Sequence, residues 1–220
     1  MKKIKVVIAE DHTIVRKGLC ALLQGEPDIE VVGEAENGRE AIKIVEKLLP
    51  DVVVMDIAMP GLNGLETTRQ LTKKFPKLKI LILTMHDNEE YIFETLRAGA
   101  AGYLIKRSAP NELISAIQSV FRGESFLSPA VSKKVIEGFV QSGGSAAKED
   151  ADYGRLTTRE REILQLIAEG NALREIASLL HISIKTVESH KAHIMEKLNL
   201  RSIAELTQYA IRKGLIHLDG

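Results

Sequence analysis

The first half of the chain alternates short apolar runs, rich in Val and Ile, with longer segments that repeat apolar residues at helical spacing. The runs predict strands at residues 4–9, 29–35, 51–57, 79–85 and 100–105. The intervening segments predict helices at residues 13–24, 38–48, 64–74, 88–98 and 110–122. Strands that are apolar on both faces and separated by helices are typical of parallel sheets. We therefore expect an α/β, flavodoxin-like, doubly wound parallel sheet of five strands in the order 2-1-3-4-5.

A small, polar stretch, QSGGSAAKEDADYG, separates the two halves of the chain and shows no apolar period. Upstream of it, Ser128 and Pro129 suit the start of a short helix. We predict a first domain over residues 1–122, a linker over 123–154 with a short helix near 128–140, and a second domain over 155–220.

The second domain shows only helical periods. Thr157 with Glu160 forms a capping box for a first helix, and Ser183 and Ser202 suit the starts of the third and fourth. A short second helix at 173–180 lies only a few residues before the third, which is longer. A short helix, a tight turn and a longer helix indicate a helix-turn-helix, so we expect a small all-α, four-helix domain.

The third helix of this domain has two different faces. An apolar stripe is formed by Ile184, Val187, Ile194 and Leu198. The opposite face carries small and polar residues, namely Lys185, Ser189, Ala192, His193 and Glu196. Such a face suits close approach to a DNA groove, although a small bundle that binds another protein is an alternative.

Composition and charge limit the other possibilities. With 220 residues, 45% of them hydrophobic and 27% charged, the chain is typical of two globular domains. Residues 151–220 contain ten Lys and Arg against nine Asp and Glu, so the second domain lacks the basic excess of many DNA-binding domains. The start, MKKIKVVIAED, runs directly into a strand, and no stretch has the length of a membrane span. We expect a cytoplasmic protein with no membrane association.

Five polar residues lie at the ends of the apolar runs, and this is the strongest functional signal. They are Glu10, Asp11, Asp56, Thr84 and Lys106. The carboxyl ends of parallel strands share one sheet edge, so these side chains should converge. Clustered carboxylates call for a hard cation such as Mg²⁺, and the hydroxyl and the ammonium suit a phosphoryl group. Taken singly, Asp11 could cap the following helix, Thr84 could bond backbone, and Lys106 could be a solvated lysine.

Both halves resemble known families. In AEDH, VVVMDIAMPGLNG, ILTMH and GYLIK, the first domain resembles a receiver domain of bacterial two-component signalling. In LTTREREILQLIAEG, REIASLLHIS and KTVESHKAHIMEKLNL, the second resembles a LuxR-type helix-turn-helix. Together they resemble the NarL/FixJ class of response regulators. The resemblance implies a phosphorylation-controlled transcription regulator whose partners are a sensor histidine kinase, double-stranded DNA and, on activation, a second copy of the chain.

The resemblance also implies roles for residues of the first domain. Asp56 would accept the phosphoryl group, and Mg²⁺ would be held by Glu10, Asp11, Asp56 and the backbone carbonyl of Ala58. This family often has two aspartates in the acidic pair, and Glu10 keeps the ligand chemistry because it can act through a water molecule. No enzyme activity is implied beyond Mg²⁺-dependent self-phosphorylation and self-dephosphorylation at Asp56.

Further residues would respond to the phosphoryl group. The resemblance implies that Thr84 and Lys106 contact it and that Tyr103 is the switch aromatic. Ala58 and His86, each two residues beyond Asp56 or Thr84, would tune dephosphorylation.

In the second domain the resemblance implies DNA contacts along the third helix, at Lys185, Thr186, Glu188, Ser189, His190, Lys191 and Ala192. Bases would be read at Glu188, Ser189 and Ala192, with phosphates contacted by the basic residues. An apolar strip of Ile203, Leu206 and Ala210 on the last helix predicts a dimer surface, unless the strip packs inside its own domain.

Two other classes also fit part of the pattern. A haloacid-dehalogenase-like phosphatase uses an aspartate nucleophile with Mg²⁺, but it needs a second acid where this chain has Ala58. The second class is a regulator whose C-terminal helices bind a partner protein. A metal site at His190 and His193 would need two more ligands nearby.

Overall fold

The computed structural model describes residues 3–85, 88–141, 151–213 and 215–216. The chain divides into two compact units, Met1–Ala147 and Lys148–Gly220, and each is described by itself. His86 and most of the polar stretch predicted as a linker lie outside the described residues.

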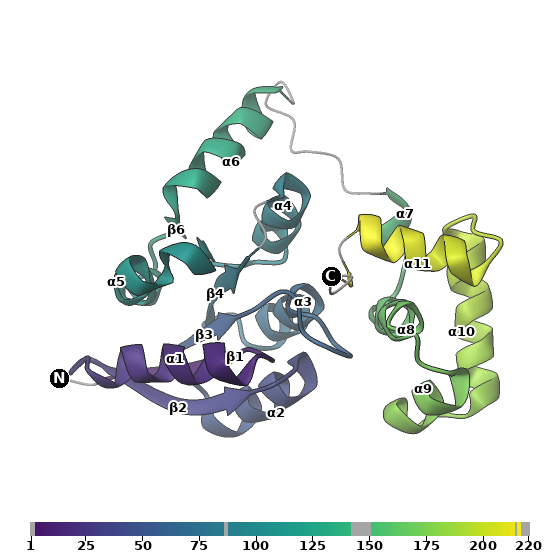
Figure 1. The fold of residues 1–220 in the computed structure, drawn as a ribbon, viewed down its shortest axis with the longest axis horizontal. Coiled ribbons are helices and arrows are strands. Elements are labelled where there is room, and N and C mark those ends of the chain that lie inside the picture. The colour runs from purple at the N-terminus through teal and green to yellow at the C-terminus, as the bar shows by residue number, and fades with distance from the viewer. Residues whose placement is uncertain (1–2, 86–87, 142–150, 214, 217–220) are drawn as a thin grey trace. The chain divides into compact units, whose positions relative to one another are not determined.

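The first unit is built on one parallel sheet (Figure 1). Its strands are β1 (Ile4–Ala9), β2 (Ile29–Ala35), β3 (Val52–Met55), β4 (Lys79–Thr84), β5 (Gly102–Ile105) and β6 (Phe126–Leu127). The order is β2-β1-β3-β4-β5-β6, so the predicted order of the first five strands is confirmed. The predicted strand count of five is wrong. A sixth strand, only two residues long, pairs in parallel with β5, and so short a run carries no recognisable alternation in the sequence.

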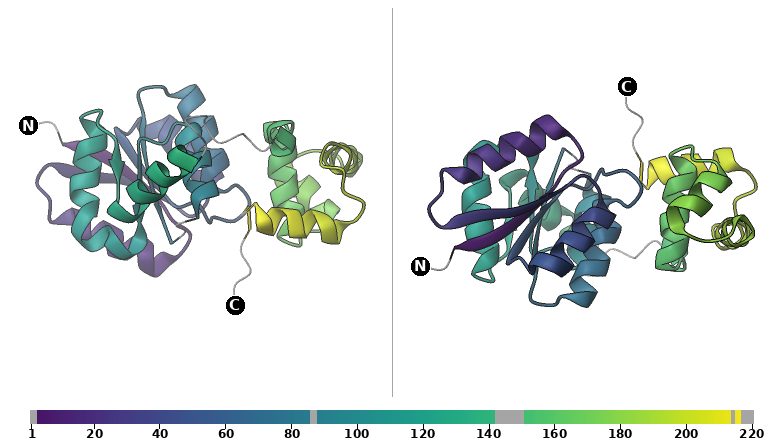
Figure 2. Two further views of the ribbon diagram at one scale, coloured as in Figure 1. Left: turned by 90° about the horizontal axis from the view of Figure 1, so that it is seen from above. Right: turned by 90° about the horizontal axis from the view of Figure 1, so that it is seen from below.

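Each strand sends alternate side chains to opposite faces of the sheet, which gives the unit two cores. Along β1, Ile4, Val6 and Ile8 join the core under α1 (Thr13–Gln24) and α5 (Ala109–Phe121). Val7 and Ala9 join the core under α2 (Gly38–Leu48), α3 (Gly64–Lys74) and α4 (Glu89–Arg97). Figure 2 shows the helices on both faces of the sheet. This double burial explains the continuous apolar runs within β1, β3, β4 and β5.

The first unit extends past residue 122, the predicted end of the first domain. Helix α6 (Pro129–Gln141) follows β6 and packs against α4 and β5. Val131 is fully buried in the core on the α4 side. A Cβ atom on Gly138 would lie 2.7 Å from the ring of Phe93 on α4, so the two helices approach closely at this glycine. The short helix predicted near 128–140 therefore belongs to the first unit.

The second unit is all helical. It contains α7 (Ala151–Gly154), α8 (Thr158–Ala168), α9 (Leu173–Leu180), α10 (Ile184–Lys197) and α11 (Ile203–Arg212). The last four are the predicted helices. The short α7 was missed, because one helical turn shows no period; its Tyr153 is buried in the same core as α8 to α11.

Side-chain caps set the starts of these helices. The capping box of Thr157 and Glu160 is present, and the hydroxyls of Ser183 and Ser202 accept hydrogen bonds from backbone amides of α10 and α11. Helix α9 ends at His181, whose left-handed backbone (φ 52°) turns the chain toward α10.

Candidate functional site

The sheet brings four of the predicted polar residues to one edge. Glu10 follows β1, Asp56 follows β3, Thr84 ends β4, and Lys106 follows β5 in a short 3₁₀ turn, η1 (Lys106–Ser108). Strand β3 lies between β1 and β4, and the amide of Asp56 donates to the carbonyl of Ala9 at 2.9 Å. Convergence at the carboxyl edge therefore follows from parallel register.

The centre of the site is a lysine that bridges two buried carboxylates. Nζ of Lys106 lies 2.7 Å from Oδ2 of Asp56 and 2.7 Å from Oε2 of Glu10. Asp56 is 3% exposed and Glu10 is 1% exposed. These contacts exclude, for Lys106, the alternative of a solvated surface lysine.

Burial and charge shift the pKa values of this group in a consistent way. Burial, and then the charge of Asp56, raise the pKa of Glu10 above its usual range, although Lys106 opposes this shift. Burial alone would lower the pKa of Lys106, but the charges and hydrogen bonds of Asp56 and Glu10 outweigh it and raise that pKa. Lys106 thus stays protonated as the counter-charge of the site.

A tight loop after β3 holds the backbone of Asp56. Oδ1 of Asp56 accepts from the amide of Ile57 at 2.7 Å, and the amide of Gly64 donates to the carbonyl of Ile57 at 2.9 Å. A Cβ atom on Gly64 would lie 1.9 Å from the carbonyl oxygen of Asp56. Asn63 caps α3 by accepting from the amide of Glu66. Only glycine fits at position 64. The Leu-Asn-Gly segment of the sequence motif therefore holds the backbone of Asp56 in position.

Asp11 and His12 form the exposed side of the site. Oδ1 of Asp11 lies 2.8 Å from Nδ1 of His12, and this carboxylate raises the pKa of His12 above its usual range. The N-cap residue of α1 is His12, and no side chain caps the helix. The alternative that Asp11 caps α1 is therefore wrong, and its carboxylate stays beside Glu10.

The side chains at this edge fit a hard divalent cation. Ligand atoms of Glu10, Asp11 and His12 lie within 4.8 Å of one another. Three carboxylates, those of Glu10, Asp11 and Asp56, accompany one ammonium, which leaves a formal charge of −2. Clustered carboxylate oxygens are the ligands that Mg²⁺ prefers, and a cation would relieve their repulsion.

The other predicted residues of the first unit occupy different depths. Thr84 and Tyr103 are both fully buried, and Tyr103 lies in the core on the α4 side. Its carbonyl accepts from the amide of Ser128 at 3.1 Å, so the backbone of β5 is joined directly to the start of α6. Ala58 is half-buried in the loop after Asp56.

Sequence reasoning missed Arg16. It lies on α1, is 5% exposed, and donates to the carbonyls of Glu10 and Asp11. Helical spacing alone would place it beside the buried Leu19, Cys20 and Leu23, and this position was the available signal.

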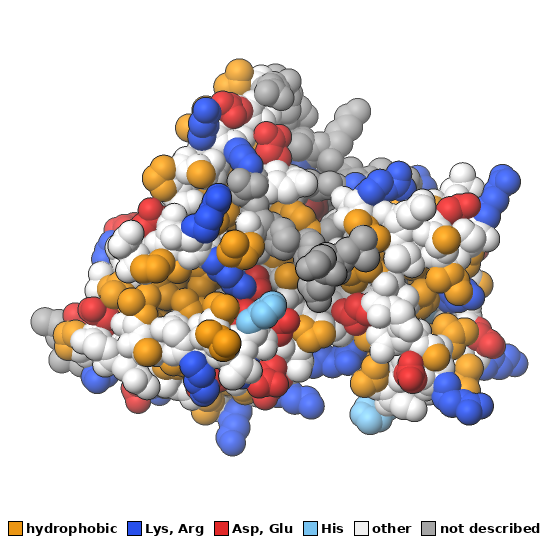
Figure 3. Space-filling model, viewed as in Figure 1, with side chains coloured by type: hydrophobic (Ala, Val, Ile, Leu, Met, Phe, Trp, Pro, Cys, Tyr) orange, Lys and Arg blue, Asp and Glu red, His pale blue; other side chains and the backbone are white. Residues whose placement is uncertain are grey.

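Helix α10 exposes the predicted DNA-contacting face. Val187 and Ile194 are fully buried, whereas Ile184, predicted to lie in the same stripe, is 40% exposed because it begins the helix. Five of the seven predicted DNA contacts are exposed, and the other two, His190 and Lys191, are half-buried. Lys and Arg side chains are interspersed with Asp and Glu over this unit (Figure 3), in agreement with its near-neutral charge.

The back of α10 is fixed to the rest of its domain. Nζ of Lys197 lies 2.7 Å from Oε2 of Glu160 on α8. Burial would raise the pKa of Glu160, but hydrogen bonds from Lys197 and from the amide of Thr157 outweigh it and lower that pKa. Arg159 of α8 donates to the carbonyl of Leu180 at the end of α9.

The structure corrects the predicted dimer strip on α11. Leu206 and Ala210 are fully buried in the core of their own unit, together with Tyr209. Only Ile203 remains half-exposed, at 50%. The alternative, in which the strip packs inside the domain, is therefore correct for Leu206 and Ala210.

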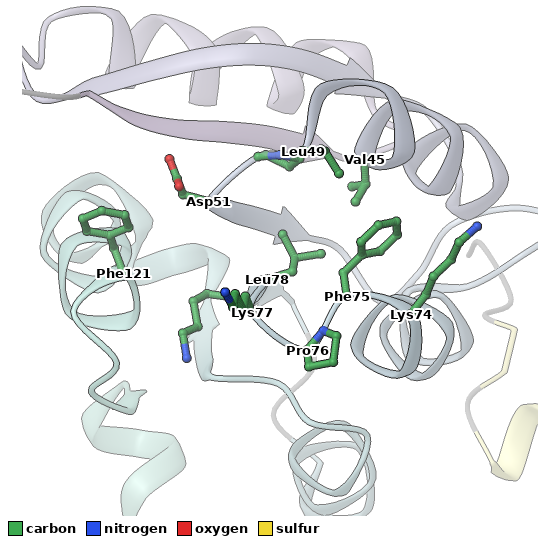
Figure 4. Close-up of a pocket in the computed structure, with 11 residues that line it drawn as sticks. Val45, Leu49, Asp51, Lys74, Phe75, Pro76, Lys77, Leu78 and Phe121 are labelled. Atoms are coloured by element: carbon green, nitrogen blue, oxygen red, sulfur yellow. The ribbon is translucent and has the colours of Figure 1, made fainter.

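A cavity of about 530 Å³ lies away from this chemistry. Figure 4 shows Val45, Leu49, Phe75 and Leu78 around it, with Asp51 to one side. Asp51 precedes β3, so the cavity is at the amino ends of the strands, opposite the carboxylate cluster. We assign it no part in the phosphorylation chemistry.

Both units match known families. Residues 6–118 match the response regulator receiver domain, and residues 155–210 match the bacterial regulatory proteins of the luxR family. The chain is a LuxR-type response regulator. Its receiver is therefore the first unit and its DNA-binding domain the second.

Relatives and solved structures agree with this assignment over nearly the whole chain. The chain is 47% identical to the oxygen regulatory protein NreC of Staphylococcus carnosus, over 96% of this chain and 99% of that protein. It is 31% identical to the response regulator RcsB of Salmonella typhimurium, with a TM-score of 0.59 over 96% of this chain and all of that one. The response regulator ChrA of a heme-sensing two-component system is 34% identical, with a TM-score of 0.54 over 98% of this chain and all of that one.

Among the helices of the described residues, none has the length and hydrophobicity needed to cross a membrane.

Proposed function

We propose that this response regulator accepts a phosphoryl group at Asp56 from a phosphohistidine of a sensor kinase and then binds DNA through α10 as a cytoplasmic transcription regulator. The observation that carries the proposal is the Lys106 ammonium that bridges Asp56 and Glu10 at the carboxyl edge of the sheet. The same side chain can screen an incoming anion and hold the nucleophile in place.

In the transfer step, a carboxylate oxygen of Asp56 attacks phosphorus, the P–N bond to the imidazole breaks, and the imidazole leaves with its electron pair. Oδ2 of Asp56 faces Lys106, while Oδ1 is occupied by the amide of Ile57. The phosphoryl oxygens then accept hydrogen bonds from the Lys106 ammonium and from the hydroxyl of Thr84. Hydrolysis reverses the modification when water attacks phosphorus and the carboxylate leaves.

We propose that Mg²⁺ is held by Glu10, Asp11, Asp56 and the carbonyl of Ala58. When bound, it supplies positive charge that offsets the carboxylates and the phosphoryl oxygens. The fit of the donor set supports this assignment. Apart from phosphoryl transfer to and from its own Asp56, we assign the chain no enzymatic turnover.

We assign Tyr103 and Thr84 to relaying the modification. Tyr103 is paired with Leu127 of β6 and shares a core with Val131 of α6. A phosphoryl group adds roughly two negative charges at pH 7 and strong acceptor oxygens. A shift of Thr84 toward it would change the packing around Tyr103 and thereby bias α6, the last element before the polar stretch that leads to the DNA-binding domain.

The exposed face of α10 is proposed to enter the major groove. Ser189, Ala192 and Glu188 would face bases, and a glutamate can accept from the amino group of cytosine. Lys185, Thr186, His190 and Lys191 would contact phosphates. A solved structure of two RcsB dimers bound to two parallel DNAs supports a homodimer on activation. We do not assign the dimer surface to Leu206 or Ala210.

Mass spectrometry of the intact chain after incubation with acetyl phosphate and Mg²⁺ tests the acceptor. We expect one phosphoryl group on the wild type and none on Asp56→Asn. Asp51→Asn is the matched control, since Asp51 lies at the opposite end of the same strand. Labelling of Asp56→Asn, or labelling in excess chelator, would contradict the assignment.

A gel shift with genomic fragments tests the output. Phosphorylation should tighten binding to specific fragments, and Ser189→Arg should change which fragments are bound. If the phosphorylated chain binds no fragment better than bulk DNA, the C-terminal helices bind a protein instead.

A further inference from the structure

A buried arginine connects the acidic loop of the receiver, Glu10 and Asp11 after β1, to the end of the neighbouring strand β2. Arg16 lies one turn into α1, and all three of its guanidinium nitrogens are used. Nη1 donates to the carbonyls of Glu10, at 2.7 Å, and Asp11, at 3.3 Å. Nε and Nη2 donate to the carboxylates of Glu34, at 3.2 Å, and Glu36, at 2.6 Å.

The two carboxylates lie at the end of β2 and in the turn that follows it. That turn is held by its own hydrogen bonds: the amide of Glu36 donates to Glu40 at 2.7 Å, and Asn37 caps α2. Arg16 therefore joins the acidic loop to a rigid element, and this joint does not depend on the site's own side chains.

The loop needs such an anchor. Ligand atoms of Glu10 and Asp11 lie within 4.8 Å of each other, and Glu10 shares the Lys106 ammonium with Asp56, so these carboxylates repel one another. When a donor holds the carbonyls of both residues, the peptide planes are fixed, and the carboxylates remain directed to the sheet edge. We propose that Arg16 is a positioning residue that preorganises Glu10 and Asp11 for the divalent cation, an inference that rests on the proposed function.

The shape of the Arg16 guanidinium, and not its charge, positions Glu10 and Asp11. Glu34 and Glu36 offset the charge of Arg16, and Lys17 pairs with Glu34 from the solvent side at 2.9 Å. A planar guanidinium can donate to two carbonyls and two carboxylates at once. A lysine has a single ammonium and cannot make all of these contacts. Arg16→Lys should thus keep the local charge and lose the anchor.

The test measures Mg²⁺ affinity by isothermal titration calorimetry on the full chain without phosphoryl donor. Residues that orient metal ligands typically contribute about 10–100-fold to metal affinity. We expect Arg16→Lys and Arg16→Met to weaken Mg²⁺ binding by about 10-fold or more. Lys17→Met is the matched control: it removes a neighbouring contact to Glu34 without touching the loop carbonyls, and it should bind Mg²⁺ like the wild type.

A second readout separates positioning from a purely structural role. At low Mg²⁺ the Arg16→Lys chain should accept the phosphoryl group from acetyl phosphate more slowly, and saturating Mg²⁺ should restore most of the wild-type rate. Wild-type Mg²⁺ affinity in folded Arg16→Lys, or a rate defect that saturating Mg²⁺ leaves unchanged, overturns the proposal.

A further variant covers the case in which Arg16 cannot be replaced without unfolding. Glu36→Gln weakens the outer end of the anchor at an exposed carboxylate (63%), and circular dichroism should show an unaltered fold. We expect weaker Mg²⁺ binding in this variant also, and unchanged affinity counts against the anchor. Failure of the wild type itself to bind Mg²⁺ or to be modified at Asp56 would instead contradict the proposed function.

Discussion

Replacement of Leu206 by alanine should destabilise the DNA-binding domain strongly. The side chain is fully buried between α11 and the other helices of its unit. Removing a buried leucine loses the transfer free energy of three carbon atoms and leaves a cavity, which together cost about 2–5 kcal/mol. A domain of this size is stable by only about 5–15 kcal/mol, so this change is a large fraction of the total.

Ile203 provides the matched control on the same helix. It is 50% exposed, so Ile203→Ala should cost well under the Leu206→Ala value, at about 1 kcal/mol or less. Thermal unfolding of the two full-length variants, followed by circular dichroism at low protein concentration, gives the comparison. For a domain of 60–100 residues each kcal/mol shifts the melting temperature by about 4–8 °C, so Leu206→Ala should melt at least about 8 °C lower.

The same pair distinguishes core packing from dimer contact. A dimer surface would make the stability loss depend on protein concentration and would spare the fold of the monomer. If Leu206→Ala melts like the wild type at low concentration but binds DNA less cooperatively, the assignment of Leu206 to the core is wrong.

Three further outcomes follow from the structure. Gly64→Ala should cost about 1–3 kcal/mol in urea unfolding and slow the labelling of Asp56, because its Cβ would collide with the Asp56 carbonyl; unaltered labelling would contradict the fit. Glu160 has a lowered pKa, so the stability gained from its contact with Lys197 is present above the usual glutamate pKa of 4.5 and lost as pH falls below it. Glu160→Gln should flatten this dependence in melts between pH 3 and 7. Ala58→Arg should change the lifetime of phosphorylated Asp56 without abolishing labelling, and equal decay across several side chains at position 58 would exclude a role in tuning.

The sequence alone was sufficient for the first five strands, for the longer helices of both domains and for the convergence of the site. Strands buried on both faces contain continuous apolar runs, so Glu10, Asp56, Thr84 and Lys106 mark the ends of these runs in the sequence itself. Parallel register then forces these ends to one edge. Helix caps such as Thr157 and Ser183 act within one turn, and for that reason they were also visible.

Long-range packing decided the rest. The two residues of β6 are a strand only because β5 offers an unpaired edge, and α6 belongs to the receiver because Val131 enters its core. The sequence of the apolar strip on α11 would be the same whether the strip contacted a partner or its own domain. Only the packing of α8 to α10 against α11 shows that Leu206 and Ala210 are buried. Arg16 joins four residues that lie up to twenty positions away along the chain, and sequence periodicity carries no information about contacts at that separation.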